Sequence, residues 1–139
     1  MKIKGYTLIE ILVVVVIIAT LAALAWPNYV AIQEKTLNRE AKASLALIRA
    51  AEKIYRLEQG YYYPYPPEGT STNVVSDINT FLKLSLPETA NVSWSISIDS
   101  TPSAEFSRAT RTGSDGRAWT IDFTGDASDP VCSGGSNCP

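Results

Sequence analysis

The sequence predicts an α+β fold in which one long, kinked N-terminal helix packs on a small antiparallel β-meander. Three observations predict it: an apolar run continues into an amphipathic stripe over residues 6–59, apolar and polar residues alternate between residues 92 and 124, and Gly- and Pro-containing turns separate the alternating segments. We therefore expect a basic segment at residues 1–5, an apolar helix at 6–27, an amphipathic helix at 28–59 and a head at 60–139.

The apolar run at residues 6–26 has the length of a membrane-spanning helix, because about 21 residues extend about 31 Å. The two lysines before it favour a cytoplasmic N-terminus, and the aromatic residues Trp26 and Tyr29 suit the interface on the far side. The sequence thus predicts a membrane anchor with a cytoplasmic N-terminus and the head on the far side.

Glu10 is the one charged residue of this run, and a carboxylate at the centre of an inserted helix costs about 2.5–3.5 kcal/mol. If the chain is cut after Gly5, the ammonium of Tyr6 lies one turn from Glu10 on the same helix face. A secretory signal peptide is an alternative, since Ala23-Leu24-Ala25 matches a small-x-small cleavage pattern, and a plain single-pass anchor is another. The carboxylate and the length of the run argue against the signal peptide.

The segment from Lys4 to Val14, Lys-Gly-Tyr-Thr-Leu-Ile-Glu-Ile-Leu-Val-Val, resembles the class III signal of type IV pilins and of the related pseudopilins of type II secretion. The resemblance implies that a prepilin peptidase removes the leader by cutting after Gly5 and N-methylates Tyr6, where most members carry phenylalanine. It also implies that Glu10 pairs with the N-terminal amine of a neighbouring subunit during assembly, the chain's own Tyr6 amine being the alternative partner.

The same resemblance implies a pilin fold and a homo-oligomeric helical filament. Subunits would wait in the inner membrane, contact the peptidase and an assembly platform, and leave as an extracellular pilus. The physics of the apolar half agrees with this expectation, because outside lipid a helix that is apolar all round must be covered by copies of itself.

Pro27 predicts a kink in the helix, because proline lacks the amide donor and crowds the preceding turn. Beyond it, apolar residues recur at spacings of three, four or seven and define an amphipathic stripe. We expect Glu52 on the polar surface of this helix and Gly60 as its C-terminal cap, which gives a helix about 80 Å long. The stripe consists of Val30, Leu37, Ala41, Leu45, Ile48, Ala51 and Tyr55.

The head begins with a Tyr- and Pro-rich connector at residues 60–69, whose four tyrosines we expect to pack on the helix and sheet. A short helix is expected at residues 76–83, capped by Ser76 and with Ile78, Phe81 and Leu82 inward. Three strands follow, with a hairpin loop at 113–116. Their expected inward residues are Val92, Trp94, Ile96 and Ile98; then Ala104 and Phe106; then Trp119, Ile121 and Phe123.

The predicted topology places Cys132 and Cys138 on the outer side of the membrane, where we expect them to form a disulfide. The sequence contains no histidine, which excludes a Ser-His-Asp triad, a Cys-His dyad and a histidine-ligated zinc ion. We predict no enzymatic activity, no cofactor and no metal. A net charge of −2 makes nucleic acid an unexpected partner, and we expect Arg108, Arg111 and Arg117 to be solvated on strand edges.

The predicted function is a structural subunit of a type IV pilus used for adhesion or twitching motility. A pseudopilin of a type II secretion system and a minor pilin are alternatives within the family. The alternative from a different class is a membrane-anchored, monomeric binding module.

Overall fold

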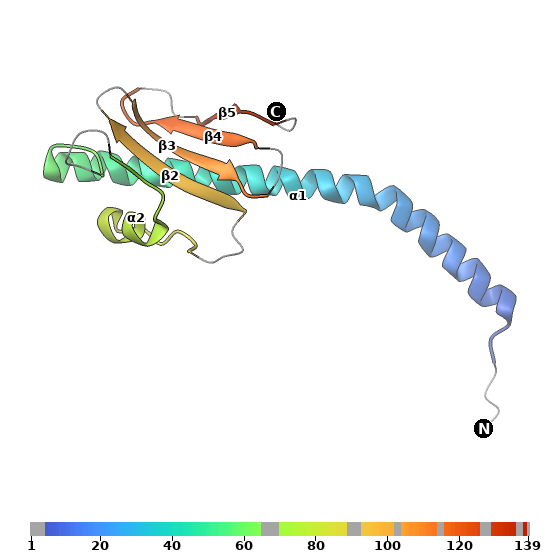
Figure 1. The fold of residues 1–139 in the computed structure, drawn as a ribbon. Coiled ribbons are helices and arrows are strands. Elements are labelled where there is room, and N and C mark those ends of the chain that lie inside the picture. Colours follow the sequence, from blue (N-terminus) through green and yellow to red (C-terminus); the bar gives the residue numbers. More distant parts are fainter. Residues whose placement is uncertain are drawn as a thin grey trace. The chain divides into compact units, whose positions relative to one another are not determined.

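The computed structural model describes residues 5–64, 70–88, 93–101, 104–113, 116–125, 129–135 and 138. The chain divides into two compact units, Met1–Leu37 and Asn38–Pro139. A single helix, α1 (Leu8–Gln59), runs through both and is blue to green in Figure 1. The structure confirms the predicted combination of a long N-terminal helix with a small antiparallel sheet.

In the first unit, α1 exposes its apolar side chains all round. Leu8 is 84% exposed and Trp26 is 73% exposed. Among the described residues, α1 is the helix that is long and apolar enough to cross a membrane. The helix continues through Pro27, and a bend at this residue stays a prediction.

In the second unit, α1 buries Ala41, Leu45 and Ile48, which confirms the predicted stripe over this part. Glu52 continues the same stripe and is fully buried, so its assignment to the polar surface was wrong. Spacings of four from Ile48 and seven from Leu45 place Glu52 on the buried face. Gly60, with φ of 88°, ends the helix by donating its N–H to the carbonyl of Arg56 over 2.8 Å, as predicted for a C-terminal cap.

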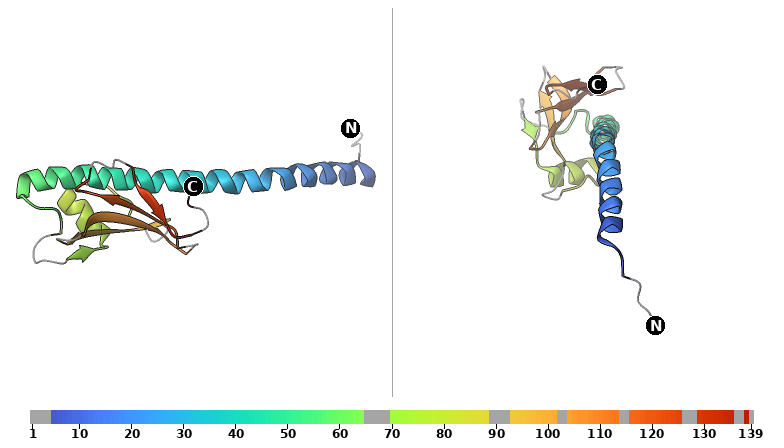
Figure 2. Two further views of the ribbon diagram at one scale, coloured as in Figure 1. Left: turned by 90° about the horizontal axis from the view of Figure 1, so that it is seen from above. Right: turned by 90° about the vertical axis from the view of Figure 1, so that its right-hand side faces the viewer.

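The sheet is an antiparallel meander in chain order (Figure 1). Its strands are β1 (Ser71–Thr72), β2 (Trp94–Thr101), β3 (Ala104–Arg111), β4 (Ala118–Asp122) and β5 (Val131–Ser133). The C-terminal part of α1 lies along one face of this sheet, as the two views of Figure 2 show. The strands β1 and β5 were not predicted, because two or three residues are too short for an alternating pattern.

The core of the head lies between α1 and the inner face of the sheet. The predicted inward residues of β2, of β4 and of the position just after β4 are buried. They are Trp94, Ile96, Ile98, Trp119, Ile121 and Phe123. The predicted inward face of β3 was wrong, because Phe106 is partly exposed whereas Ser107 and Ala109 are buried. The register explains this, since Ala109 pairs with Ile96 and cross-strand partners share a face. The side chains of Val92 and Ala104 lie outside the described residues, as does part of the predicted loop at 113–116.

The short helix α2 (Val75–Leu82) connects β1 to β2 and buries Ile78 and Leu82 as predicted. Its N-cap is Val74, with no hydrogen bond from a capping side chain, so the predicted cap at Ser76 was wrong. Phe81 was predicted inward but is half exposed. One face of its ring stacks on the buried ring of Tyr63, with 4.9 Å between centroids.

Candidate functional site

The predicted processing site, Gly5-Tyr6, precedes the first turn of α1. Both residues are exposed and non-helical, and Tyr6 is 82% exposed. A Cβ atom added to Gly5 would meet nothing within 4 Å. The peptide bond between them therefore lies in exposed, non-helical backbone that a protease can reach.

Glu10 and Thr7 form a capping box at the start of α1. The backbone N–H of Thr7 donates to Oε2 of Glu10 over 3.0 Å, and the Thr7 hydroxyl donates to the same oxygen over 2.9 Å. In return, the N–H of Glu10 approaches the Thr7 Oγ1 at 3.3 Å. These contacts satisfy two of the amide donors that a helix N-terminus leaves open.

The role of Thr7 was missed by the sequence analysis, although Thr-x-x-Glu before an apolar run is the signal for a capping box. Only Oε2 of Glu10 is engaged in this way. Within the described residues the other oxygen, Oε1, accepts no hydrogen bond, so the carboxylate can cap its own helix and still accept a further cationic donor.

The head contains a second unusual carboxylate. Glu52 is fully buried and its Oε2 accepts the backbone N–H of Tyr63 over 2.9 Å. Burial raises the pKa of Glu52 to about 8; the Tyr63 N–H opposes the rise and the nearby charge of Glu105 adds to it. The side chain is thus mostly protonated at neutral pH, and it ties the connector after α1 to the helix.

The tyrosines of the connector pack on the helix and sheet, as predicted for those that the structure describes. Tyr62 and Tyr63 are both buried. Arg56 donates to the Tyr62 hydroxyl over 2.9 Å, and that hydroxyl donates to the carbonyl of Phe123 over 3.3 Å. The ring of Tyr61 meets that of Tyr55 edge-on, and Tyr65 lies outside the described residues.

The expected solvation of the three arginines is wrong for Arg117, which is fully buried. Its guanidinium lies 5.5 Å from the ring centroid of Trp94, and that of Arg111 lies 5.8 Å from the same ring. A planar guanidinium is weakly hydrated and stacks on aromatic faces, which explains its place in the core. Arg108 is exposed.

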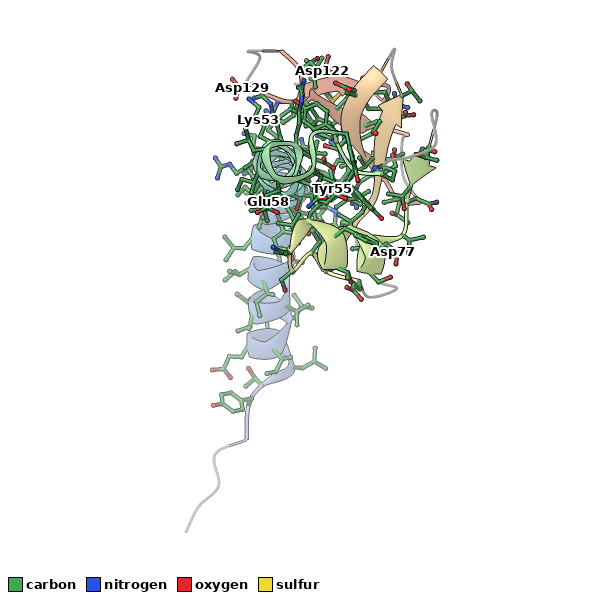
Figure 3. All side chains as sticks on the ribbon, turned by 90° about the vertical axis from the view of Figure 1, so that its left-hand side faces the viewer. Lys53, Tyr55, Glu58, Asp77, Asp122 and Asp129 are labelled. Atoms are coloured by element: carbon green, nitrogen blue, oxygen red, sulfur yellow. A yellow bond between two sulfur atoms is a disulfide. The ribbon has the colours of Figure 1, made fainter. Side chains whose placement is uncertain are left out.

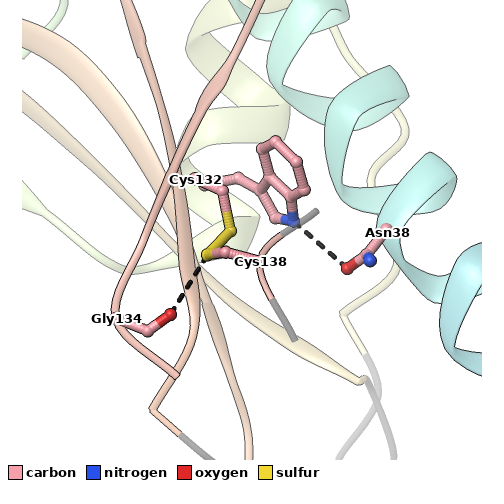
Figure 4. The surroundings of a disulfide bond; sticks show 5 residues. Asn38, Cys132, Gly134 and Cys138 are labelled. Atoms are coloured by element: carbon pink, nitrogen blue, oxygen red, sulfur yellow. Dashed lines mark hydrogen bonds between the residues drawn. A yellow bond between two sulfur atoms is a disulfide. The ribbon is translucent and has the colours of Figure 1, made fainter. Parts of the chain in front are cut away.

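A disulfide joins Cys132 and Cys138 near the C-terminus (Figure 4), with their Cα atoms 5.7 Å apart. Cys132 on β5 pairs with Trp119 on β4. The Trp119 indole N–H donates to the side-chain oxygen of Asn38 over 3.2 Å, and the ammonium of Lys42 lies 4.2 Å from the ring centroid. The disulfide loop is therefore fastened to a strand that is itself bonded to α1.

Within the part of the chain that the structure describes, no group of three or more His, Cys, Asp or Glu side chains is placed to hold a metal ion. Two carboxylates on α1 stand out by their surroundings. One caps an exposed, apolar helix N-terminus, and the other is buried in the head.

The N-terminal segment that contains Gly5, Tyr6 and Glu10 matches a known family motif. Residues 1–26 match the model of the prokaryotic N-terminal methylation motif. The chain is 38% identical over 65 residues to the type IV major pilin protein PilA of Myxococcus xanthus, covering 47% of this chain and 30% of that protein. It is 36% identical over 73 residues to the type II secretion system core protein G of Escherichia coli, covering 52% of this chain and 50% of that protein.

A protein of the same description from Pseudomonas aeruginosa is 40% identical over 66 residues, which cover 48% of this chain and 46% of that protein. The matches span half or less of the length of these three relatives. No solved structure gives a significant match.

Proposed function

We propose that this chain, which belongs to the type IV pilin and pseudopilin family, is a structural subunit of a type IV pilus that is stored in the inner membrane and polymerised through α1. The observation that carries the proposal is the exposed apolar half of α1 with one engaged and one open carboxylate oxygen at its start. Lipid covers such a helix in the membrane, and copies of the same helix cover it in a filament.

The proposed processing follows from the N-terminal methylation motif. A prepilin peptidase removes residues 1–5 by cutting after Gly5 and methylates the new N-terminus at Tyr6. Cleavage turns the Tyr6 amide into an ammonium. The open Oε1 of Glu10 then accepts the ammonium of a neighbouring subunit, while Oε2 keeps the capping contacts with Thr7.

The later steps of the proposal concern location. The precursor spans the inner membrane with its head outside, and an assembly platform transfers processed subunits into an extracellular filament for adhesion or motility. The relatives are pilus and secretion-system proteins rather than enzymes, so we propose no catalytic role for the head.

A pseudopilin of a type II secretion system is the second candidate, because several of the relatives are named core protein G of that system. The two candidates share the N-terminal chemistry. They differ in whether the subunits form a long filament on the cell surface. Long filaments in the sheared surface fraction of cells with native expression support the pilus, whereas secretion of exoproteins that depends on this chain, without such filaments, supports the pseudopilin.

The test of the N-terminal chemistry combines mass spectrometry with one variant of the cleavage site and two matched variants of Glu10. The first residue of the assembled subunit is expected to be N-methylated Tyr6, and Gly5→Glu is expected to leave the precursor uncut. Glu10→Ala removes both the cap and the charge, whereas Glu10→Gln keeps a capping oxygen and removes the charge. We expect both Glu10 variants to be processed and inserted but lost from the filament fraction.

Filaments from Glu10→Gln at wild-type yield would show that capping, rather than charge pairing, is the role of this side chain. Filaments from both variants at wild-type yield would contradict the proposed role of Glu10 in assembly altogether.

A further inference from the structure

The C-terminal half of α1 carries a second apolar strip, on the side that the sheet does not cover. We call it the outer strip. Its members are exposed, with Leu47 at 48%, Ile54 at 58% and Leu57 at 87% exposure. The complete set is Ala43, Leu47, Ala50, Ile54 and Leu57.

The spacing of the outer strip is that of a coiled coil. Its members follow one another at intervals of four, three, four and three residues, which is a period of 3.5. The buried stripe that contains Leu45 and Ile48 lies on a different face of the helix, so packing against the sheet does not explain the outer strip. The alanines at positions 43 and 50 leave room for a second helix to approach closely.

Opposite charges flank the strip. Lys53 and Glu58 are both exposed, and five residues place them about 140° apart around the helix. In the end-on view of Figure 3 their labels stand on opposite sides of α1. In coiled-coil notation they occupy a g position and the following e position, which are the two positions that meet between parallel, in-register helices.

Neither charge has an opposite charge at helix spacing in its own chain. The residues three and four positions from Lys53 are Arg49, Ala50, Arg56 and Leu57, and those before Glu58 are Ile54 and Tyr55. Within α1, neither charge is therefore paired at helix spacing, and both are exposed to a second copy of the chain. Lys83, just beyond α2, lines the same groove as Glu58 and is the cation of the same chain that competes for it.

A groove of about 280 Å³ runs along one border of the strip. Leu47, Ala50 and Ile54 belong to its wall on α1. Phe81, in the last turn of α2, and Leu84, just beyond α2, belong to the other wall. A helix seated on the outer strip would thus have α2 beside it, and half-exposed Phe81 would gain apolar cover.

We propose that the outer strip is a self-association surface on which two copies of this chain pair as parallel, in-register helices, with Lys53 of each copy facing Glu58 of the other. The parallel orientation rests on the proposed membrane insertion, because two subunits anchored through the same N-terminal segment in one membrane point the same way. The pairing acts before or apart from filament growth, since a filament related by a screw axis staggers its subunits along the axis.

Cysteine crosslinking tests the register. Both native cysteines are bonded to each other, so an added cysteine is the free thiol of the chain. Ala50→Cys and Ile54→Cys are each placed alone in the full chain, in membranes of cells that lack the assembly platform, and oxidised. The matched control is Ser95→Cys, an exposed position on the outer face of β2. We expect a disulfide-linked dimer from each strip variant and only background dimer from the control.

A charge exchange tests the flanking pair. In the Ala50→Cys background, Lys53→Glu and Glu58→Lys are each expected to reduce dimer yield, because each brings like charges together. The double variant restores opposite charges and is expected to recover the yield. The positions are exposed, so none of these changes touches the core.

Dimers equal to the control, no recovery in the double variant, or crosslinks that form only between different positions of two variants would overturn the proposal. Crosslinking of Ile54→Cys to Val16→Cys alone would instead assign the strip to the apolar half of another copy. Filaments are scored separately, for the wild-type chain in cells that contain the assembly platform. No crosslinking in the first cells with filaments in the second would overturn this inference alone, whereas crosslinking in the first without filaments in the second would count against the proposed function.

Discussion

The two halves of α1 place the same residue type, glutamate, in opposite surroundings. Glu10 stands at an exposed, apolar helix end and uses one oxygen to cap it. Glu52 lies on the buried stripe of the head, where loss of solvent raises its pKa to about 8. The difference teaches that the role of a carboxylate on this helix depends on whether the chain's own sheet covers its segment: it leaves the segment around Glu10 exposed and buries Glu52.

The largest difference between the halves is expected for apolar truncation. Leu45→Ala removes a fully buried side chain and is expected to cost the head about 2–5 kcal/mol of unfolding free energy. Leu12→Ala truncates a side chain that is 54% exposed in the first unit, so we expect the head to unfold at an unchanged urea concentration. Urea unfolding of the full chain in detergent micelles, followed by tryptophan fluorescence, measures both variants. Equal losses would remove the distinction between the two halves.

The second prediction concerns pH and Glu52. Its pKa is raised from 4.5 to about 8, so the folded head holds a proton that the unfolded chain releases. The contribution of this proton to the unfolding free energy of the head is fully present below pH 4.5. It is lost as the pH rises towards 8, at up to about 1.4 kcal/mol per pH unit.

Glu52→Gln keeps an oxygen for the Tyr63 N–H and does not titrate. We therefore expect the unfolding free energy of this variant to depend less on pH between 4.5 and 8 than that of the wild type. Parallel slopes in the two proteins would show that the pKa of Glu52 is not raised in the folded head. Glu58→Gln, at an exposed position, controls for the loss of any one carboxylate.

The smallest effect is expected at the cap of the exposed half. Thr7→Ala removes the hydroxyl that accepts the Glu10 N–H and is expected to destabilise the first turn by about 1 kcal/mol. Thr7→Ser keeps the hydroxyl and is the matched control. Amide hydrogen exchange of Glu10 in micelles is expected to speed up about fivefold in the alanine variant only. Similar acceleration in both variants would argue that the methyl group, rather than the hydroxyl, holds this turn.

Much of the fold was predictable because periodicity is a local property of the sequence. The stripe at Ala41, Leu45 and Ile48, the alternation around Trp94 and Trp119 and the terminal Gly60 all indicated their elements correctly. The inward face of β3 was not predictable in this way. Its apolar Phe106 suggested one face, but the register with β2 placed the smaller Ser107 and Ala109 against the core.

The candidate site divides in the same manner. The N-terminal motif was legible because its residues lie within a few positions of each other, although the Thr7–Glu10 cap was overlooked. The burial of Glu52 and Arg117 was missed, because residue type indicates solvent whereas their surroundings in the folded head decide otherwise. For Glu52 the spacing to Ile48 was the available signal, and for Arg117 only the position of Trp94 across the sheet shows what the guanidinium packs on.

The sequence by itself determined the long helix, its apolar N-terminal half, the N-terminal motif and the antiparallel meander, since each depends on spacing along the chain. Tertiary structure alone decided which face of β3 points inward, how the tyrosine connector is held by Glu52, and that the outer strip of α1 stays uncovered by the sheet. The physical reason is that burial and hydrogen bonding depend on residues distant in sequence, and these meet only when the sheet closes over one side of the helix.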